Sequence, residues 1–391
     1  MEIPFIDLKS QYKRIEEKIK KNINNVFKHG KFILGPEVYE LEERLAEYVG
    51  VKNCITCSSG TDALLLALMA CGVQRGDMIF TTPFTFMSTA EVISLLGAIP
   101  VFVDIDPTTF NINPNELKKA IEAVDKRDPS IYPLPRILLY EEDNFTKKAI
   151  IAVDLFGLCA DYNEINKIAE QMGIYVIEDG AQSFGGEYFG KKACSLAHIG
   201  CTSFFPAKPL GCYGDGGAIF VESDEVAELI RSLRVHGQGR NKYENLRIGI
   251  NGRLDTIQAA VLLAKLEIFD DEIKKRQIVA NRYTQKLKAS PYVKTPYVPE
   301  QLLSAWAQYS IVVKDRDGLI NFLKKGNIPT NIYYPRPIHL QKAFNYLGYK
   351  EGDMKISEDI AKNIVSLPMH PYLDEKTQEY IVDRVIEFYN Q

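Results

Sequence analysis

The sequence predicts an α/β protein whose larger part is built on a mostly parallel sheet of seven strands. Between residues 54 and 221, short apolar runs alternate with helical patterns. Such βα alternation is typical of a parallel sheet covered by helices. After residue 251 the pattern changes to longer helices with one short strand. We therefore expect a large domain over residues 1–250 and a smaller C-terminal α+β domain over residues 251–391.

An amphipathic helix is expected near the start of the chain, because isoleucine or valine recurs at helical spacing from Ile15 to Val26. The predicted strands are Cys54–Cys57, Met78–Thr81, Pro100–Asp104, Ala149–Val153, Ile174–Glu178, Ile199–Phe204 and Gly217–Val221. The predicted helices between them are Asp62–Cys71, Met87–Leu96, Pro114–Ala123 and Asn163–Met172.

The second part is expected to open with one long helix over Arg253–Arg276 that continues toward Ala289. A strand at Gln308–Val313, a helix at Arg316–Lys325 and two terminal helices should follow. The segment Asp125–Phe145 is rich in proline and charge, which predicts a surface loop.

Composition excludes several classes of protein. Apolar residues make up 46% and charged residues 25% of the 391 residues, which are globular values. A net charge of -4 provides no general attraction to nucleic acid or to anionic membranes. The apolar run Ala63–Val73 is too short to span a bilayer, and Met1–Asp7 does not resemble the start of a signal peptide.

The cysteines predict a reducing compartment. Seven cysteines, an odd number, are scattered over a long chain, so we expect reduced thiols and a cytoplasmic protein. Cys54-x-x-Cys57 is not followed by a second pair of cysteines or histidines at metal spacing. Core packing on a strand is therefore favoured over metal binding, and we expect no metal.

Lys208 is the most informative residue of the chain. It lies on a short loop between two apolar strands, five residues after Ser203 and 29 after Asp179, which stands at the end of a strand. These are the parts needed to hold pyridoxal 5′-phosphate (PLP). A lysine forms a Schiff base with its aldehyde, an aspartate pairs with its pyridinium nitrogen, and hydroxyls and backbone amides bind its phosphate.

A candidate phosphate site is Cys57-Ser58-Ser59-Gly60-Thr61-Asp62, between a strand and an apolar helix. Small residues let the backbone approach a phosphate, and the first N–H groups of a helix favour an anion. The alternative is an ordinary helix cap by serine or threonine. The presence of Lys208 and Asp179 favours the phosphate.

Other candidates keep two interpretations. Asp179 pairs either with the pyridinium nitrogen or with a nearby Arg or Lys, because a buried carboxylate needs a partner. Gln182 could donate to the phenolic oxygen of the cofactor. Phe84 or Phe86 could stack on the cofactor ring or pack in the core.

Substrate contacts are less defined. The basic segment Arg231–Arg247, or Arg253, could hold a diphosphate, although a solvated loop is the usual explanation of a charge run. Tyr333 and Tyr334 precede a proline and either line a pocket or belong to a rigid loop.

Seven short segments, spread nearly from end to end, point to one family. They are Phe5–Leu8, Gly35–Val38, Ser59–Leu64, Glu178–Gln182, Ser203–Gly217, Asn251–Ala260 and Leu367–Pro371. With them the chain resembles the DegT/DnrJ/EryC1/StrS sugar aminotransferases. These are PLP enzymes with the type I, aspartate aminotransferase-like fold.

The resemblance implies roles for the candidate residues. Lys208 would bind the cofactor as a Schiff base and carry protons, and Asp179 would pair with the ring nitrogen. Gln182 would contact the phenolic oxygen, and Phe86 would stack on the ring. The phosphate would be bound by Gly60, Thr61 and Ser203.

The resemblance also implies an assembly and a substrate class. The family is homodimeric with shared active sites, and Asn251 would reach the phosphate of the neighbouring subunit's cofactor. The segments Cys201–Gly217 and Arg234–Gln238 look closest to a subgroup that aminates UDP-2-acetamido-2-deoxy-3-keto-glucuronate. Glutamate is the usual donor there, and the product serves bacterial surface polysaccharides such as the lipopolysaccharide O-antigen. Tyr333 in place of an expected histidine, and an apparent insertion at Asp125–Phe145, depart from that subgroup.

The predicted function is a PLP-dependent aminotransferase that moves an amino group from an amino acid, with glutamate and 2-oxoglutarate as the donor pair, to a nucleotide-linked keto-sugar. The sugar could instead be a UDP- or dTDP-linked 3- or 4-keto-6-deoxy sugar. Related dehydratases carry a histidine in place of the lysine, so Lys208 argues against them. The remaining alternative is a non-catalytic, PLP-binding regulatory protein.

Overall fold

The structure is a computed structural model and describes residues 3–140 and 145–390. Its central sheet has seven strands in the order β1-β9-β8-β5-β4-β2-β3. Their bounds are β1 Asn53–Cys57, β2 Asp77–Thr81, β3 Ile99–Phe102, β4 Thr146–Val153, β5 Tyr175–Asp179, β8 Ile199–Ser203 and β9 Gly217–Val221. β9 is antiparallel to both of its neighbours, and the other pairings are parallel. The predicted seven-stranded, mostly parallel sheet is confirmed.

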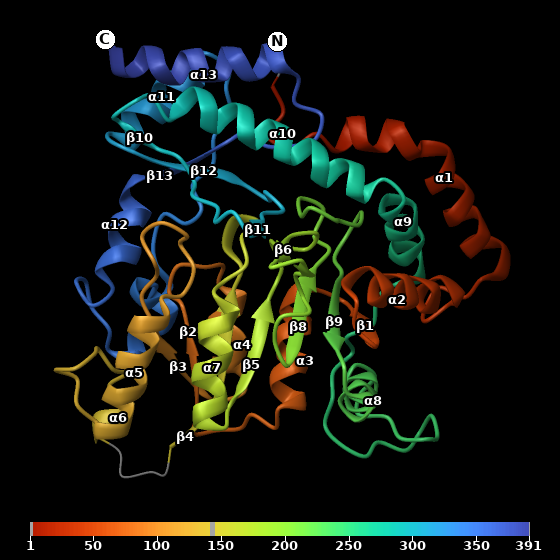
Figure 1. Cartoon of the computed structure of the whole chain (residues 1–391). Coiled ribbons are helices and arrows are strands. Elements are labelled where there is room, and N and C mark those ends of the chain that lie inside the picture. The colour runs from red at the N-terminus through yellow and green to blue at the C-terminus, as the bar shows by residue number, and fades with distance from the viewer. Residues whose placement is uncertain (1–2, 141–144, 391) are drawn as a thin grey trace.

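Helices cover both faces of this sheet (Figure 1). Those of the large part are α3 Gly60–Ala70, α4 Ser88–Leu95, α5 Pro114–Lys126, α7 Tyr162–Met172 and α8 Asp224–Leu233. Buried side chains of α5 and α7 form one core with the sheet, and those of α3, α4 and α8 form another on the opposite face. The four helices predicted between the strands are thus present, with ends shifted by up to three residues.

The sheet brings several chain segments to one edge. β1 is antiparallel to β9, and β9 is antiparallel to β8, so β1 runs in the same direction as β8 and β5. Their carboxyl ends therefore lie together. Cys57 and Ser203 are both in register with Gly217, and Asp179 ends the next strand, β5. Ligands of α/β sheets bind outside this edge.

The N-terminal helices form a flank beside the sheet. α1 (Leu8–His29) and α2 (Pro36–Val49) both pack against α9 (Thr256–Leu266), as Figure 1 shows on the right. Ile15 and Ile19 of α1 are buried against Val261 and Ala264 of α9. The amphipathic N-terminal helix is therefore confirmed, and its apolar stripe has a helix as its partner.

The long helix expected from Arg253 to beyond Arg276 is wrong. The chain forms α9 and then α10 (Phe269–Leu287), and the helical backbone is lost at Ile268, which has φ -110° and ψ 0°. α9 buries side chains on the core beneath α1 and α2, and Phe269 and Ile273 of α10 still belong to that core, whereas the later side chains of α10, from Val279 to Leu287, are buried in the C-terminal core. The two halves have different packing partners, so the chain turns between them.

The C-terminal part contains a second, three-stranded sheet in the order β10-β12-β13. Its strands are β10 Val293–Lys294, β12 Tyr309–Val313 and β13 Ile364–Leu367, and its further helices are α11 Arg316–Lys325, α12 Lys355–Asn363 and α13 Glu375–Asn390. The predicted strand, the helix after it and the two terminal helices are confirmed. A third sheet joins the two parts, because β11 (Leu302–Leu303) pairs with β6 (Glu187–Tyr188), which pairs with β7 (Lys191–Lys192). The domain boundary at residue 250 stays a prediction.

The segment Asp125–Phe145 is not simply a surface loop. Tyr132, Leu134 and Leu138 are buried in the core under α5, and Ile137–Tyr140 form a short helix, α6. The Tyr132 hydroxyl also accepts a hydrogen bond from the backbone N–H of Asp104 at 2.8 Å. The prolines and charged residues of the segment predicted a surface loop, although these three apolar side chains are buried. Residues 141–144 lie outside the described residues.

In the described part of the chain, no helix is both long and apolar enough to cross a membrane.

If this segment is part of the core, Leu138→Ala should lower the free energy of unfolding by about 2–5 kcal/mol, because it leaves a cavity. Leu138 is 3% exposed. The matched control is Leu95→Ala, since Leu95 is 70% exposed and should change stability by less than about 0.5 kcal/mol. Urea unfolding at one protein concentration measures both. If the two variants lower the free energy of unfolding equally, the segment is a surface loop and not part of the core.

Candidate active site

Asp179 lies at the carboxyl edge of the sheet and is only 5% exposed. Its Oδ2 accepts a hydrogen bond from the Thr89 hydroxyl at 2.8 Å, and its Oδ1 accepts one from the backbone N–H of Ala181 at 3.3 Å. Burial raises the pKa of Asp179, while the Thr89 hydroxyl and the charge of Lys208 oppose that rise. Among the described residues Asp179 forms no ion pair within 4 Å, so the alternative of a paired structural acid has no support there.

Lys208 lies on the loop that follows β8, within electrostatic reach of Asp179. Burial lowers the pKa of Lys208, and the negative charge of Asp179 acts in the opposite direction. No residue within 3–140 or 145–390 forms a hydrogen bond or ion pair with its Nζ. A lysine with a lowered pKa and a free Nζ is suited to nucleophilic and proton-transfer chemistry.

The loop that carries Lys208 is fastened by residues that the sequence did not reveal. Lys265 of α9 is 1% exposed and donates from Nζ to the carbonyl of Gly211 at 2.6 Å. The same Nζ lies 4.2 Å from the centre of the Tyr213 ring. Gln258 accepts from the backbone N–H of Tyr213 at 2.9 Å. The helix α9 therefore holds the chain immediately after Lys208.

The beginning of α3 forms a cradle with no room for side chains. Ser59 caps the helix by accepting from the Asp62 N–H at 3.0 Å, so the expected alternative, a helix cap, is correct for Ser59. A cap satisfies one N–H of the first turn, and others remain without intrahelical acceptors. A Cβ on Gly60 would lie 2.6 Å from Cβ of Ser203, and one on Gly217 would lie 2.4 Å from the Ser59 carbonyl oxygen. Gly60, Thr61 and Ser203 are thus brought together at a site suited to an anion.

Gln182 is oriented by two neighbours. Its Oε1 accepts from the backbone N–H of Phe156 at 2.7 Å, and its Nε2 donates to the Tyr334 hydroxyl at 3.2 Å. A side-chain amide has two N–H groups, so the second is left to donate into the site. Burial and the charge of Asp179 both raise the pKa of Tyr334, which keeps its hydroxyl protonated.

The structure separates Phe84 from Phe86. Phe84 is completely buried in the core, whereas Phe86 is 55% exposed. The Phe86 ring lies 6.4 Å from the ring of Tyr334, centre to centre, which places it next to the Gln182 contact. Of the two rings, Phe86 is therefore the one that is available to a ligand.

Asn251 and Arg253 follow an exposed segment, residues 236–250. The Asn251 side chain is exposed and forms no hydrogen bond with any described residue. The carbonyl of Gly252 accepts from the Ser58 N–H at 3.0 Å, which ties this stretch to the cradle. Arg253 is partly buried, and its Nε has no partner. The structure does not bring Asn251 to Lys208 or Asp179 of the same chain by any hydrogen bond.

The basic segment Arg231–Arg247 is mostly committed to internal contacts. Arg231 donates to Glu228 at 2.7 Å, Arg234 forms a buried ion pair with Glu42 at 2.6 Å, and Arg247 donates to the Ser232 hydroxyl at 2.6 Å. Arg240 and Lys242, by contrast, are exposed and form no ion pair with any described residue, so this part of the segment is a solvated loop. Tyr333 is partly buried, and its ring lies 5.8 Å from that of Tyr334.

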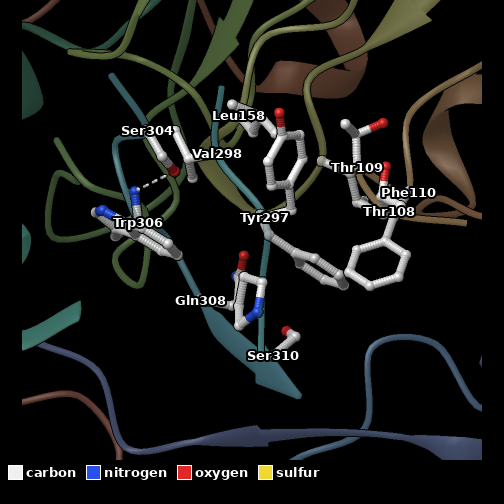
Figure 2. Close-up of a pocket in the computed structure, with 13 residues that line it drawn as sticks. Thr108, Thr109, Phe110, Leu158, Tyr297, Val298, Ser304, Trp306, Gln308 and Ser310 are labelled. Carbon is white, nitrogen blue, oxygen red and sulfur yellow. Dashed lines mark hydrogen bonds between the residues drawn. The ribbon is translucent and has the colours of Figure 1, made fainter. Parts of the chain in front are cut away.

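A small cavity lies behind the site, between the two parts of the chain (Figure 2). It is lined by Phe156, Tyr297, Trp306 and Gln308, and the buried Oε1 of Gln308 has no partner. Its volume of about 20 Å³ holds about one water molecule. It is too small for a substrate. Within the described residues no group of three or more acidic, histidine or cysteine side chains could hold a metal ion.

If the cradle holds the cofactor phosphate, Gly60→Ala should weaken PLP binding by roughly ten- to a hundredfold, because crowding a packed site costs about 1–3 kcal/mol. Gly326→Ala, directly after α11, is the control, since its Cβ would come no closer than 3.1 Å to another heavy atom and its φ of -86° suits alanine. Titration of the apoprotein followed by absorbance measures both affinities. Unchanged affinity in Gly60→Ala would place the phosphate elsewhere.

Comparison with known proteins identifies the family of this chain. The pattern of the DegT/DnrJ/EryC1/StrS aminotransferase family matches residues 13–386. The chain is 48% identical to the UDP-2-acetamido-2-deoxy-3-oxo-D-glucuronate aminotransferase of Pseudomonas aeruginosa over 95% of this chain and 96% of that protein. It is 41% identical to a pleiotropic regulatory protein of Geobacillus stearothermophilus, over 100% and 99% of the two chains. The crystal structure of a DegT DnrJ EryC1 StrS aminotransferase from Brucella abortus superposes with a TM-score of 0.93 at 48% identity, covering all of both chains.

Proposed function

Because this chain belongs to the DegT/DnrJ/EryC1/StrS aminotransferase family, we propose that it aminates a UDP-linked 2-acetamido-3-keto uronic acid with L-glutamate as the donor. The chain is a PLP-dependent aminotransferase of a nucleotide-linked keto-sugar. The uronic acid is supported by the 48% identity, over nearly the whole of both chains, to an aminotransferase named for that substrate. Such a product would serve the biosynthesis of bacterial surface polysaccharide, including O-antigen.

The residues at the sheet edge fit PLP. The cradle of Gly60, Thr61 and Ser203 offers backbone N–H groups and a hydroxyl where side chains are excluded. Each oxygen of Asp179 accepts one hydrogen bond and can accept another. The Nζ of Lys208 has no partner among the described residues. When bound, PLP supplies a reactive aldehyde and a ring that accepts electrons from the donor's α-carbon.

Each protein group then has a definite task. Asp179, as a carboxylate, keeps a proton at the ring nitrogen. With PLP bound, Lys208 Nζ would take the proton from the donor's α-carbon and deliver it to the cofactor carbon, and in the second half of the reaction it would carry a proton in the opposite direction, to the sugar carbon. That transfer requires a neutral amine, and the burial that lowers the pKa of Lys208 favours it. Gln182 donates to the cofactor's phenolic oxygen, and Phe86 covers one face of the ring.

A homodimer in the cytoplasm completes the proposal. Exposed apolar side chains gather at the end of α1 and in the turn before α2, at Phe27, Phe32 and Ile33, and on the segment 236–250, at Tyr243 and Ile248. Exposed apolar groups of this kind support a protein interface. The free side chain of Asn251 would then reach the phosphate of the neighbouring subunit. All seven cysteines are buried and free, which is consistent with a reducing compartment.

The substrate side of the pocket has two candidates for recognition. The partnerless Nε of Arg253 suits an anionic group of the sugar nucleotide, because an unpaired buried guanidinium is costly. Tyr334 stands beside Gln182 and Phe86, and the ring of Tyr333 lies 5.8 Å from that of Tyr334. Both tyrosines would contact the sugar. The second candidate substrate, a UDP- or dTDP-linked keto-6-deoxy sugar, has no carboxylate. A regulatory role has support in the relative of that name, although Lys208 and Asp179 stand here in the arrangement that catalysis requires.

A panel of amino sugars distinguishes these substrates. With 2-oxoglutarate present, the enzyme should deaminate a UDP-2-acetamido-3-amino uronic acid at least roughly tenfold faster than UDP- or dTDP-linked 3- or 4-amino-6-deoxy sugars. The 6-deoxy sugars lack the carboxylate and would leave the Nε of Arg253 unpaired. Glutamate formation measures each rate. A faster dTDP-linked substrate would replace the uronic acid, and no turnover of any sugar by PLP-loaded enzyme would favour the regulatory alternative.

Lys208→Ala should lower turnover by more than about a hundredfold, because it removes the proton carrier. Borohydride should no longer attach PLP to the protein. Lys191→Ala, an exposed lysine on β7, is the control and should behave as wild type in both assays. Borohydride labelling that persists in Lys208→Ala would show that another lysine holds the cofactor.

A further inference from the structure

Thr89 is a buried hydroxyl at the edge of the candidate site, and no motif in the sequence indicates a role for it. It is the second residue of α4 and is completely buried. Its Oγ1 lies 2.8 Å from Oδ2 of Asp179. No other side chain among the described residues donates a hydrogen bond to that carboxylate.

The direction of this hydrogen bond is fixed by chemistry. A carboxylate accepts hydrogen bonds only, so the Thr89 hydroxyl must donate to it. Oγ1 of Thr85 lies 3.1 Å from Oγ1 of Thr89. Because the single hydrogen of Thr89 points to Asp179, Thr85 must donate to Thr89. The two hydroxyls therefore form a chain that ends on Asp179, and such chains strengthen each member.

The contact matters because Asp179 is otherwise poorly supported. Its other donor, the Ala181 N–H, is at 3.3 Å. Burial favours the neutral form of the carboxyl, and a neutral Asp179 could not hold a proton at the ring nitrogen. The Thr89 hydroxyl stabilises the anion and lowers the pKa of Asp179 against the effect of burial.

The same short segment also places the ring-covering side chain. The backbone N–H of Thr89 donates to the carbonyl of Phe86 at 3.3 Å. Residues 85–89 thus orient both the exposed Phe86 ring and the donor to Asp179. One turn at the start of α4 therefore positions both Phe86, which would cover the face of the cofactor ring, and Asp179, which would contact the nitrogen of that ring.

We propose that Thr89 is a positioning residue for amino transfer, whose hydroxyl holds Asp179 as the oriented carboxylate that pairs with the cofactor nitrogen, with Thr85 fixing the direction of that hydroxyl. The inference rests on the proposed role of Asp179.

Thr89→Val tests the inference, because valine keeps the shape and removes the hydroxyl. The readout is the saturating rate of the glutamate half-reaction in PLP-loaded enzyme, followed by the change in cofactor absorbance. The rate should fall roughly ten- to a hundredfold, the usual effect of a lost hydrogen bond to a charge. The glutamate concentration at half-maximal rate should change less than threefold, and Thr89→Ser should restore most of the rate.

Thr81→Val is the matched control. Thr81 is equally buried and donates to the carbonyl of Ile151 at 3.0 Å, without contacting Asp179. It should lower the melting temperature but leave the saturating rate within about twofold of wild type. An equal loss of rate in Thr81→Val, or a Thr89→Ser variant as slow as Thr89→Val, would overturn the inference.

Asp179→Asn separates failure of the inference from failure of the proposed function. A slow Asp179→Asn with a Thr89→Val as fast as wild type would reject Thr89 alone. A fast Asp179→Asn would reject the role of Asp179 itself, and the inference with it.

Discussion

The burial of one carboxylate, that of Asp179, is the constraint on which the rest of the site depends. An anion at the end of an interior strand is stable only where donors and positive charge surround it. Thr89, the Ala181 N–H and the nearby Lys208 meet that need from three different segments. In the proposed function, the ring nitrogen of PLP would add a further donor. A buried carboxylate needs hydrogen-bond donors, and this need would also make Asp179 selective for a ligand that offers an N–H group.

Two more buried acids extend this principle to the loops around the site. Asp154 follows β4 and accepts from the Ala160 N–H at 2.9 Å and from the Ser183 hydroxyl at 2.7 Å. Glu178, next to Asp179, accepts from two backbone N–H groups of the segment 194–196. Burial raises the pKa of both acids. Consecutive strand ends therefore use carboxylates to fasten loops, and one position, Asp179, is proposed to face the cofactor.

The sequence predicted the sheet well and predicted candidate site residues that the structure brings to one edge of that sheet, because apolar runs bounded by turns and the residues at strand ends are local signals. It could not find the break at Ile268, since helical character continues from α9 into α10 and only their different packing partners turn the chain. It could not separate Phe84 from Phe86, as both are aromatic and two residues apart. Thr89 and Lys265 were missed because a threonine or lysine within a helix has no pattern that reveals a distant partner. The roles of Asn251, Arg253 and Tyr333 stay predictions, since they depend on a substrate or a second subunit.

The attachment of the Lys208 loop to α9 has a consequence for motion within the enzyme. Lys265 and Gln258 tie that loop to a helix that packs on α1 and α2, so Lys208, Asp179 and the cradle belong to one rigid assembly. Tyr334 comes from the other side, and its 3.2 Å contact with Gln182 joins that assembly to the chain leading to the C-terminal sheet. The chain after Tyr334 is also bound to the large part, because the Ile338 N–H donates to the carbonyl of Pro83 at 2.8 Å and the Ile338 side chain is buried in the core under α5. Tyr334 is therefore held from both sides, and the structure leaves little freedom of movement to the groups that a substrate would meet.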